Sequence, residues 1–249
     1  HINCNQVAGT VNQGIWKNDC DPCATSPYAI PNIKLWHRYG HDIVVGGTLR
    51  ATPADILANV SDGDKVDEWK DQIGTNHAVQ STDADKPTWY ATDKSLKFTT
   101  NEHYDLTSAV TYAAADEFTI LLAYIQLNSV SIANETLYLG NSGNDYFKYV
   151  NATTIEVSVG GTTQTITGPS ISQTAYTNFV LRKDAAQNAQ IFIEGVPWGA
   201  SFLITSSFSI SEYGATTDGY IAAHMQFDRA LTDKECQYLA KIGKKILNL

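Results

Sequence analysis

The chain has 249 residues, of which 43% are hydrophobic and only 17% are charged. Seventeen basic residues against 26 acidic ones give a formal net charge of −9, and no basic cluster of the kind that binds nucleic acid is present. The longest apolar run, residues 118–125, is far shorter than the roughly 20 residues of a membrane-spanning helix. We therefore expect neither nucleic acid nor a membrane as a partner.

The first 30 residues contain three of the four cysteines and are otherwise rich in Asn and Gly, as loops are. Cys4 can form a disulfide with Cys20 or Cys23, which would pin a segment that cannot build its own core. The spacing of Cys20 and Cys23 also fits zinc, but a second such pair is absent, so we favour the disulfide and expect no cofactor here. We predict an extended N-terminal arm over residues 1–30 and a folded domain over residues 31–249.

Beyond residue 33 the sequence predicts short strands separated by turns rich in Gly and Asn. Residues 94–98 alternate polar and apolar side chains with the period of a half-buried strand. Residues 118–125 are more uniformly apolar, which is typical of a strand in the middle of a sheet. Further strands are predicted at residues 137–139, 146–149, 154–159, 179–182, 189–193, 196–198 and 220–227.

Two helices are predicted among these strands. Thr52 followed by Pro53 offers an N-cap and a proline at the first helical position. Thr232 and Glu235 have the spacing of a capping box, and apolar residues then recur at helical spacing. Cys236 belongs to that apolar face, so we expect a buried, unreactive thiol. Without an internal repeat of about 20–50 residues, these elements predict an all-β fold, a two-sheet antiparallel sandwich with a short helix and a C-terminal helix.

Eight segments follow one another in a characteristic order: residues 33–36, 63–72, 77–80, 86–88, 96–98, 118–120, 191–197 and 228–235. In this order they resemble the laminin G-like, concanavalin A-type jelly-roll domains. The resemblance covers residues 33–247 and implies a concanavalin A-like jelly roll. Its particular form is most similar to the domains found in bacteriophage structural proteins. An insertion at residues 41–61 and the cysteine-bearing arm depart from the family pattern.

Catalytic motifs of the enzymes with this fold are missing. Jelly-roll glucanases carry Glu-x-Asp-x-x-Glu on one strand, and the chain lacks that motif. The Gln-Ile-His of jelly-roll alginate lyases is replaced by Gln72-Ile73-Gly74, which removes the proposed base. Nucleophile-elbow, phosphate-loop and His-Glu-x-x-His motifs are also absent from the sequence. We expect no enzymatic activity.

Glycan binding needs an exposed aromatic plane with amide or carboxylate groups beside it. The candidates are Trp89, Tyr90, His103, Tyr104, Asn141, Asn144, Asp145, Tyr146 and Trp198. Core packing is the alternative for each aromatic candidate, and Trp36 and Trp69 are assigned to the core. The resemblance also allows a calcium ion, for which Asp62, Asp64 and Asp67 are candidate ligands, although their spacing is not that of an EF-hand loop.

The resemblance implies a non-enzymatic bacteriophage virion protein, a capsid decoration or fibre component, anchored on other virion proteins through residues 1–30. Such a protein is expected to form a symmetric homo-oligomer and to display the jelly roll outward, where host-surface glycans are further partners. The alternative is a secreted or surface carbohydrate-binding or adhesion module with an extracellular location. A polysaccharide-degrading enzyme is a third, disfavoured interpretation.

Overall fold

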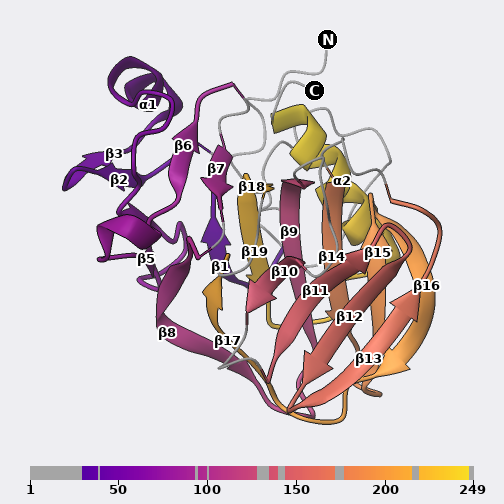
Figure 1. The fold of residues 1–249 in the computed structure, drawn as a ribbon. Helices are drawn as coiled ribbons and strands as arrows, with labels where there is room; N and C mark the ends of the chain where they lie inside the picture. Colours follow the sequence, from indigo (N-terminus) through magenta and orange to yellow (C-terminus); the bar gives the residue numbers. More distant parts are fainter. Residues whose placement is uncertain are drawn as a thin grey trace, which may run out of the picture.

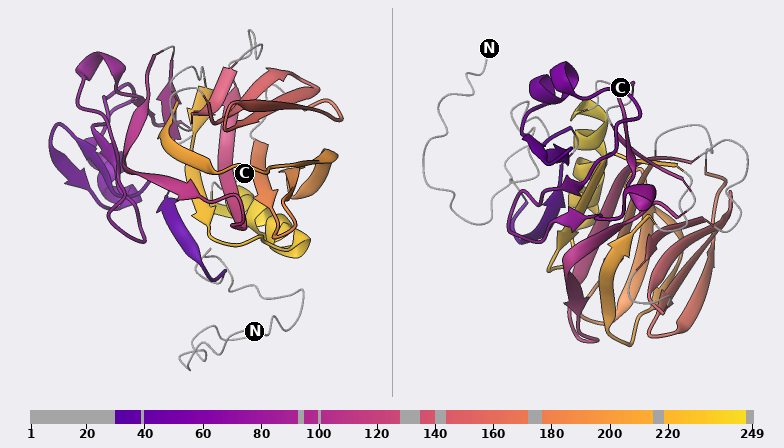
Figure 2. Two further views of the ribbon diagram at one scale, coloured as in Figure 1. Left: turned by 90° about the horizontal axis from the view of Figure 1, so that it is seen from below. Right: turned by 60° about the vertical axis from the view of Figure 1, so that its left-hand side comes forward.

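The computed structural model describes residues 30–38, 40–92, 95–99, 101–127, 135–139, 144–171, 177–214 and 219–246. Within these ranges two antiparallel β-sheets pack face to face, and α2 (Asp233–Ile246) lies on the outer face of one of them (Figure 1). Figure 2 shows the layers from two further sides, with α1 (Pro53–Asn59) outside them at one edge. The predicted antiparallel sandwich with two helices is confirmed. No helix of the described residues has the length and apolar character to cross a bilayer.

Nine strands of the described residues form one sheet in the order β16-β15-β14-β9-β18-β7-β6, with β19 beside β9 and β1 beside β19. The sheet forks at β9, because β18 and β19 follow one another along the chain and both pair with it. The strands are β1 (Ile33–His37), β6 (Thr88–Tyr90), β7 (Ser95–Phe98), β9 (Phe118–Leu127), β14 (Thr177–Lys183), β15 (Asn188–Ile193), β16 (Val196–Leu203), β18 (Gly219–Ile221) and β19 (Ala223–Phe227).

Ten strands of the described residues form the second sheet in the order β13-β12-β11-β10-β17-β8-β5-β4-β2-β3. They are β2 (Ile43–Val45), β3 (Thr48–Arg50), β4 (Glu68–Trp69), β5 (Ala78–Val79), β8 (Tyr104–Tyr112), β10 (Glu135–Leu139), β11 (Tyr146–Asn151), β12 (Thr154–Val159), β13 (Thr162–Thr167) and β17 (Phe208–Tyr213). A single 3₁₀ turn of the described residues covers Asp83–Asp85. The strands β8, β13 and β17 are among those that the sequence did not lead us to predict.

The main core fills the space between the sheets with apolar side chains from both, including Trp69, Phe98 and Phe179. A second apolar cluster lies on the outer face of the nine-stranded sheet, where Leu239 of α2 packs with Phe192 of β15. Trp36 belongs to this second cluster, so the predicted burial of Trp36 and Trp69 is confirmed. Each large apolar side chain buried in this way contributes about 1.5–3 kcal/mol, which holds α2 on the sheet.

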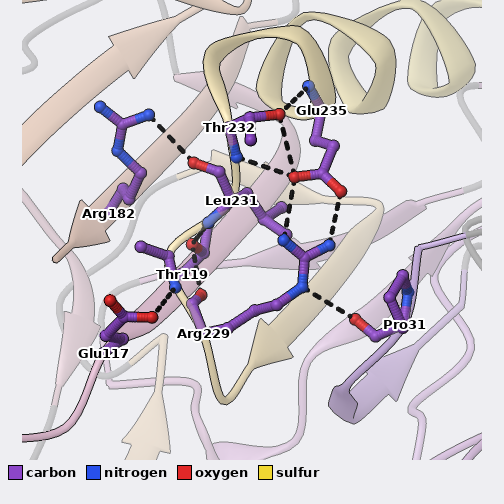
Figure 3. Close-up of polar contacts among 9 residues, drawn as sticks. Pro31, Glu117, Thr119, Arg182, Arg229, Leu231, Thr232 and Glu235 are labelled. Carbon is purple, nitrogen blue, oxygen red and sulfur yellow. Dashed lines mark hydrogen bonds and ion pairs between the residues drawn. The ribbon is translucent and has the colours of Figure 1, made fainter. Parts of the chain in front are cut away.

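Polar contacts fix the start of α2 (Figure 3). The Arg229 guanidinium donates two hydrogen bonds to the Glu235 carboxylate, and its Nε donates to the Pro31 carbonyl at 3.3 Å. Thr232 and Glu235 form the predicted capping box, with the Thr232 amide donating to Glu235 at 2.8 Å and the Glu235 amide donating to Thr232 Oγ1 at 3.3 Å. Burial would raise the pKa of Glu235, but the hydrogen bonds and charge of Arg229 lower it below its ordinary value.

β1 joins the two sheets at one side of the sandwich. One edge of β1 pairs with β19 of the nine-stranded sheet, which places His37 opposite His224. The other edge faces the residues that follow β4 of the ten-stranded sheet. There the Trp36 amide donates to Asp71 Oδ1 at 3.0 Å, and the Gln72 amide donates to the Trp36 carbonyl at 2.8 Å. We call β1 with these two borders the β1 seam.

Candidate functional site

Three of the aromatic ligand candidates are core residues. Trp89, Tyr104 and Trp198 are only 2%, 0% and 4% exposed. The Tyr104 hydroxyl donates to the Val66 carbonyl at 3.1 Å, and Trp198 Nε1 donates to the Pro169 carbonyl at 2.8 Å. The prediction that these three residues bind a ligand is therefore wrong, because their rings face the space between the sheets.

The acidic candidate in the turn before β11 has a structural role. Asp145 is buried, and its two carboxylate oxygens accept hydrogen bonds from the backbone amides of Gly160 at 2.6 Å and Ser209 at 2.9 Å. Because both oxygens are used to tie two segments together, the prediction of Asp145 as a sugar ligand is wrong. Asn144 is exposed, and Asn141 lies outside the described residues.

Two tyrosines keep part of their surface open. Tyr146 of β11 is partly exposed, and its hydroxyl lies 3.3 Å from Thr163 Oγ1 on β13. Tyr90 is also partly exposed, but its ring packs against that of Tyr220 with the centroids 4.6 Å apart. Tyr146 is therefore the candidate aromatic residue on the outer face of the ten-stranded sheet.

The carboxylates predicted to bind calcium serve other contacts. Asp62 and Asp64 each accept a hydrogen bond from a backbone amide, at 2.8 and 2.7 Å. Asp67 forms an ion pair with Lys86 at 2.9 Å, and this hydrogen bond lowers the pKa of Asp67 although burial alone would raise it. No group of three or more His, Cys, Asp or Glu side chains in the described ranges is placed to hold a metal ion. The three aspartates therefore form no ligand set there.

The cysteines divide into two groups. Cys4, Cys20 and Cys23 lie outside the described residues, so their disulfide or zinc site stays a prediction. Cys236 is fully buried, and burial raises the pKa of its thiol to about 12. This thiol is therefore a poor nucleophile and a poor ligand at neutral pH.

The outer face of the ten-stranded sheet carries a continuous cross-strand row of residues. From β13 to β3 the pairing aligns Thr163, Ser158, Tyr146, Leu139, Glu212, Asp105, Val79, Glu68, Val44 and Leu49. Neighbouring residues in such a row lie one strand spacing apart, about 4.8 Å. Glu212 of β17 and Asp105 of β8 are directly opposite each other near its middle.

These two carboxylates have neither a hydrogen bond nor an ion pair among the described residues. Asp105 is exposed and Glu212 is partly buried. Burial raises the pKa of Glu212; the charge of His103 opposes this rise, and the charge of Asp105 adds to it. Like charges on opposed positions of neighbouring strands destabilise a sheet. Stability of the fold therefore gives no reason for this pair.

His103 lies near the pair, and its ring is held in one orientation. Nδ1 lies 2.9 Å from the Asn101 carbonyl, which only accepts, so Nδ1 carries the proton. Nε2 accepts from the side-chain nitrogen of Gln80 at 3.0 Å, while Gln80 Oε1 accepts from the Thr82 amide at 2.9 Å. Gln80 is buried and so fixes the imidazole. We call Asp105, Glu212 and His103 the carboxylate site.

The carboxylate site offers hydrogen-bond acceptors on an open sheet face to a ligand rich in hydroxyl or amino groups. His103 is one of the residues predicted from the sequence, whereas Asp105 and Glu212 are not. The alternation of apolar and polar residues in Phe208–Tyr213 is a strand signal, but it would place Glu212 on the inner face with Phe208 and Ile210. The shift in register after Ile210 is what brings Glu212 opposite the exposed Asp105. The pairing of Glu212 with Asp105, more than a hundred residues away in the chain, has no local signal.

Comparison with protein-family models and with curated proteins gives no match. Among solved structures, the chain is similar to a Trypanosoma rangeli sialidase in complex with sialic acid, at 14% identity and a TM-score of 0.49 over 76% of this chain and 33% of the sialidase. It is also similar to the binding domain of Paraclostridial Mosquitocidal Protein 1, at 10% identity and a TM-score of 0.46 over 84% and 52% of the two chains. A structure of botulinum neurotoxin type C, whose cell entry depends on interaction with two ganglioside molecules, matches at 11% identity and a TM-score of 0.46 over 85% of this chain and 51% of the toxin chain. The chain thus spans about a third to a half of these structures, and likenesses at this level do not bear on its function.

Proposed function

We propose that the chain is a non-catalytic glycan-binding module whose ligand lies across the outer face of the ten-stranded sheet, over the carboxylate site. The observation that carries the proposal is the opposed pair Asp105 and Glu212, which meets no hydrogen-bond donor among the described residues. A partly buried polar group without a partner costs free energy. Sugar hydroxyls are donors that would remove this cost.

Tyr146 supports the same assignment. It lies two strands from Glu212 in the cross-strand row, with Leu139 between them, which corresponds to about 10 Å. A disaccharide covers such a span. One sugar ring would then pack on the tyrosine while the hydroxyls of the next reach the carboxylates.

Charge limits the class of glycan. The chain has a net charge of −9, and the row contains a third carboxylate, Glu68, whose charge is paired with Lys70 at 2.9 Å. Asp105 and Glu212 form no such ion pair with a Lys or Arg side chain in the described part of the chain, and His103 is the basic group nearest to them in the carboxylate site. Sialylated or uronic-acid glycans would be repelled there, so the ligand is a neutral or amino sugar.

The proposal is tested by titration calorimetry with neutral, amino and sialylated oligosaccharides. Hydrogen bonds to charged groups contribute about 1.5–3 kcal/mol, so Asp105→Ala and Glu212→Ala are each expected to weaken binding about 10- to 100-fold. The matched control is Glu156→Ala on the same face, where Glu156 pairs with Lys148 at 4.0 Å, and it should bind like the wild type. Unchanged binding by both carboxylate variants, or a preference for sialylated glycans, would contradict the proposal.

Glycoside hydrolysis is a second candidate, favoured by the same pair. Opposed residues on antiparallel strands have Cβ atoms about 4.5–5.5 Å apart, and retaining glycosidases hold their two carboxyl groups about 5–5.5 Å apart. Glu212, whose pKa burial raises, would be the acid and Asp105 the nucleophile. Chromatography of bound oligosaccharides after long incubation distinguishes the two functions: products that disappear with Glu212→Gln indicate an enzyme, and intact oligosaccharides indicate a binding module.

The virion role, the anchoring arm and the homo-oligomer stay predictions. They rest on the resemblance found in the sequence and on residues 1–29, which lie outside the described ranges. Immunogold labelling of phage particles from the source would test them directly.

A further inference from the structure

Two histidines meet inside the β1 seam. His37 and His224 are opposed residues of β1 and β19, both are fully buried, and their rings stack with the centroids 5.9 Å apart. Trp69 of β4 packs on His37 with a centroid distance of 5.4 Å. Two of the six histidines of the chain therefore share one buried contact at the junction of the two sheets.

Gln226 determines which protonation state of His224 fits the seam. Its Oε1 accepts a hydrogen bond from the Tyr112 hydroxyl at 2.9 Å, so its amide nitrogen is the atom that faces His224 Nε2 at 3.3 Å. An amide nitrogen only donates, which assigns His224 Nε2 as an acceptor in a neutral ring. A proton on Nε2 would place two donors against each other.

His37 is also held in its neutral form. Its Nε2 donates to the Asn76 carbonyl at 3.2 Å. Burial and then the charge of His224 lower the pKa of His37 well below its ordinary value; the Asn76 carbonyl opposes this in part, and His77 adds to it. Burial also lowers the pKa of His224, to about 3.

The other ionisable groups at the seam serve neighbouring contacts. Asp71 accepts hydrogen bonds from three backbone amides, of Trp36, Ile73 and Gly74, each at 3.0 Å. His77 Nδ1 accepts from the Asp71 amide at 3.1 Å, and its Nε2 lies 3.9 Å from Glu68. Tyr112 reaches the seam through Gln226, and burial raises its pKa. Among these groups, His37 and His224 are the fully buried ones that gain a charge in acid.

We propose that the β1 seam is an acid-sensitive strap: protonation of His37 and His224 detaches β1 from β19 and from residues 71–76, while the remaining strands stay folded. β1 suits this role because it is an edge strand with β19 as its single neighbour in the nine-stranded sheet. β9, β14 and β15 pair with one another without it.

Hydrogen exchange of the wild-type chain at pH 7.5 and 5.0, corrected for intrinsic rates, tests the strap. The protection of the β1 amides is expected to fall at least tenfold at pH 5.0 relative to that of β15. Unchanged protection of β1, or an equal loss in β1 and β15, would overturn the proposal, because the seam would then be inert or the whole domain would unfold.

Variants assign the effect to the two rings. His37→Gln with His224→Gln keeps a donor for the Asn76 carbonyl and an acceptor for Gln226 but cannot gain a charge. We expect this double variant to keep the protection of β1 at pH 5.0. The control His41→Gln changes a histidine outside the seam, beside the Ala51 carbonyl, and should leave the response to acid intact. A double variant that folds and still loses β1 in acid would contradict the assignment.

Discussion

Glu212 is a residue whose ionised side chain destabilises the fold. It is partly buried, it faces Asp105 across neighbouring strands, and burial raises the pKa of its carboxyl group. A raised pKa in the folded state means that the ionised form destabilises the fold at neutral pH, and that this penalty disappears as the pH falls below the raised value. Residues selected for binding commonly carry such a stability cost.

Glu212→Gln is therefore expected to raise the free energy of unfolding at pH 7 by about 0.5 kcal/mol, because it removes one of two opposed like charges. Urea denaturation followed by tryptophan fluorescence measures the change. Glu156→Gln is the matched control: it removes the partner of Lys148 on the same face and should leave stability unchanged or slightly lower. A destabilised Glu212→Gln would indicate a structural role for this carboxylate.

At the scale of elements, α2 is positioned by a glycine turn as well as by its polar contacts. Gly195, between β15 and β16, has a φ of +75°, and a Cβ there would lie 2.6 Å from the Cα of Gln237 in α2. Gly47, between β2 and β3, has nearly the same φ of +76°, but a Cβ there would meet no other atom within 4 Å. The two glycines thus share a backbone requirement and differ in what they touch.

Gly47→Ala is expected to cost about 1–2 kcal/mol from the left-handed backbone alone. Gly195→Ala should cost about 1–3 kcal/mol more, because the added methyl group pushes against the backbone of α2. Thermal or urea unfolding gives the two values, and hydrogen exchange should show faster exchange of α2 in Gly195→Ala only. Equal losses in the two variants would mean that α2 adapts to the methyl group without strain.

For the whole molecule, features that depend on neighbouring residues in the sequence are predicted correctly, and features that depend on the pairing of distant segments are not. The start of α1 at Thr52 and the capping box of α2 are local patterns, and both are present as predicted. Trp89 and Trp198 are ligand candidates in the sequence but core residues in the fold, because the face of a strand that points inward depends on its pairing with distant segments. Asp105 and Glu212 of the carboxylate site were missed for the same reason: a shift in register between β17 and β8 brings them together, and no local pattern encodes it.

The stability of the whole sandwich should depend on pH in two separate ranges. His224 has a lowered pKa of about 3 in the fold, so below about pH 6.5 the unfolded chain binds more protons than the folded chain. The free energy of unfolding therefore decreases as the pH decreases in this range. His224 alone accounts for up to about 2 kcal/mol of this loss by pH 5. Asp67 and Glu235 have lowered pKa values, so the stability they contribute is present above their ordinary values and is lost in more acidic solution.

Urea unfolding from pH 8 to pH 3 should therefore show a plateau above about pH 7, a first decline that begins near pH 6.5, and a second near pH 4. Detachment of β1 limits how much unfolding free energy is lost in the first decline. Once β1 has detached, the two histidines can take up protons in water while the other strands stay folded. His37→Gln with His224→Gln should remove most of the first decline and keep the second, while His41, whose pKa burial also lowers, accounts for a small remainder. If the wild-type chain were equally stable at pH 7.5 and pH 5, the prediction would be wrong. The pKa values of His37 and His224 would then be the same in the folded and unfolded chain, although both side chains are buried at the junction of the two sheets.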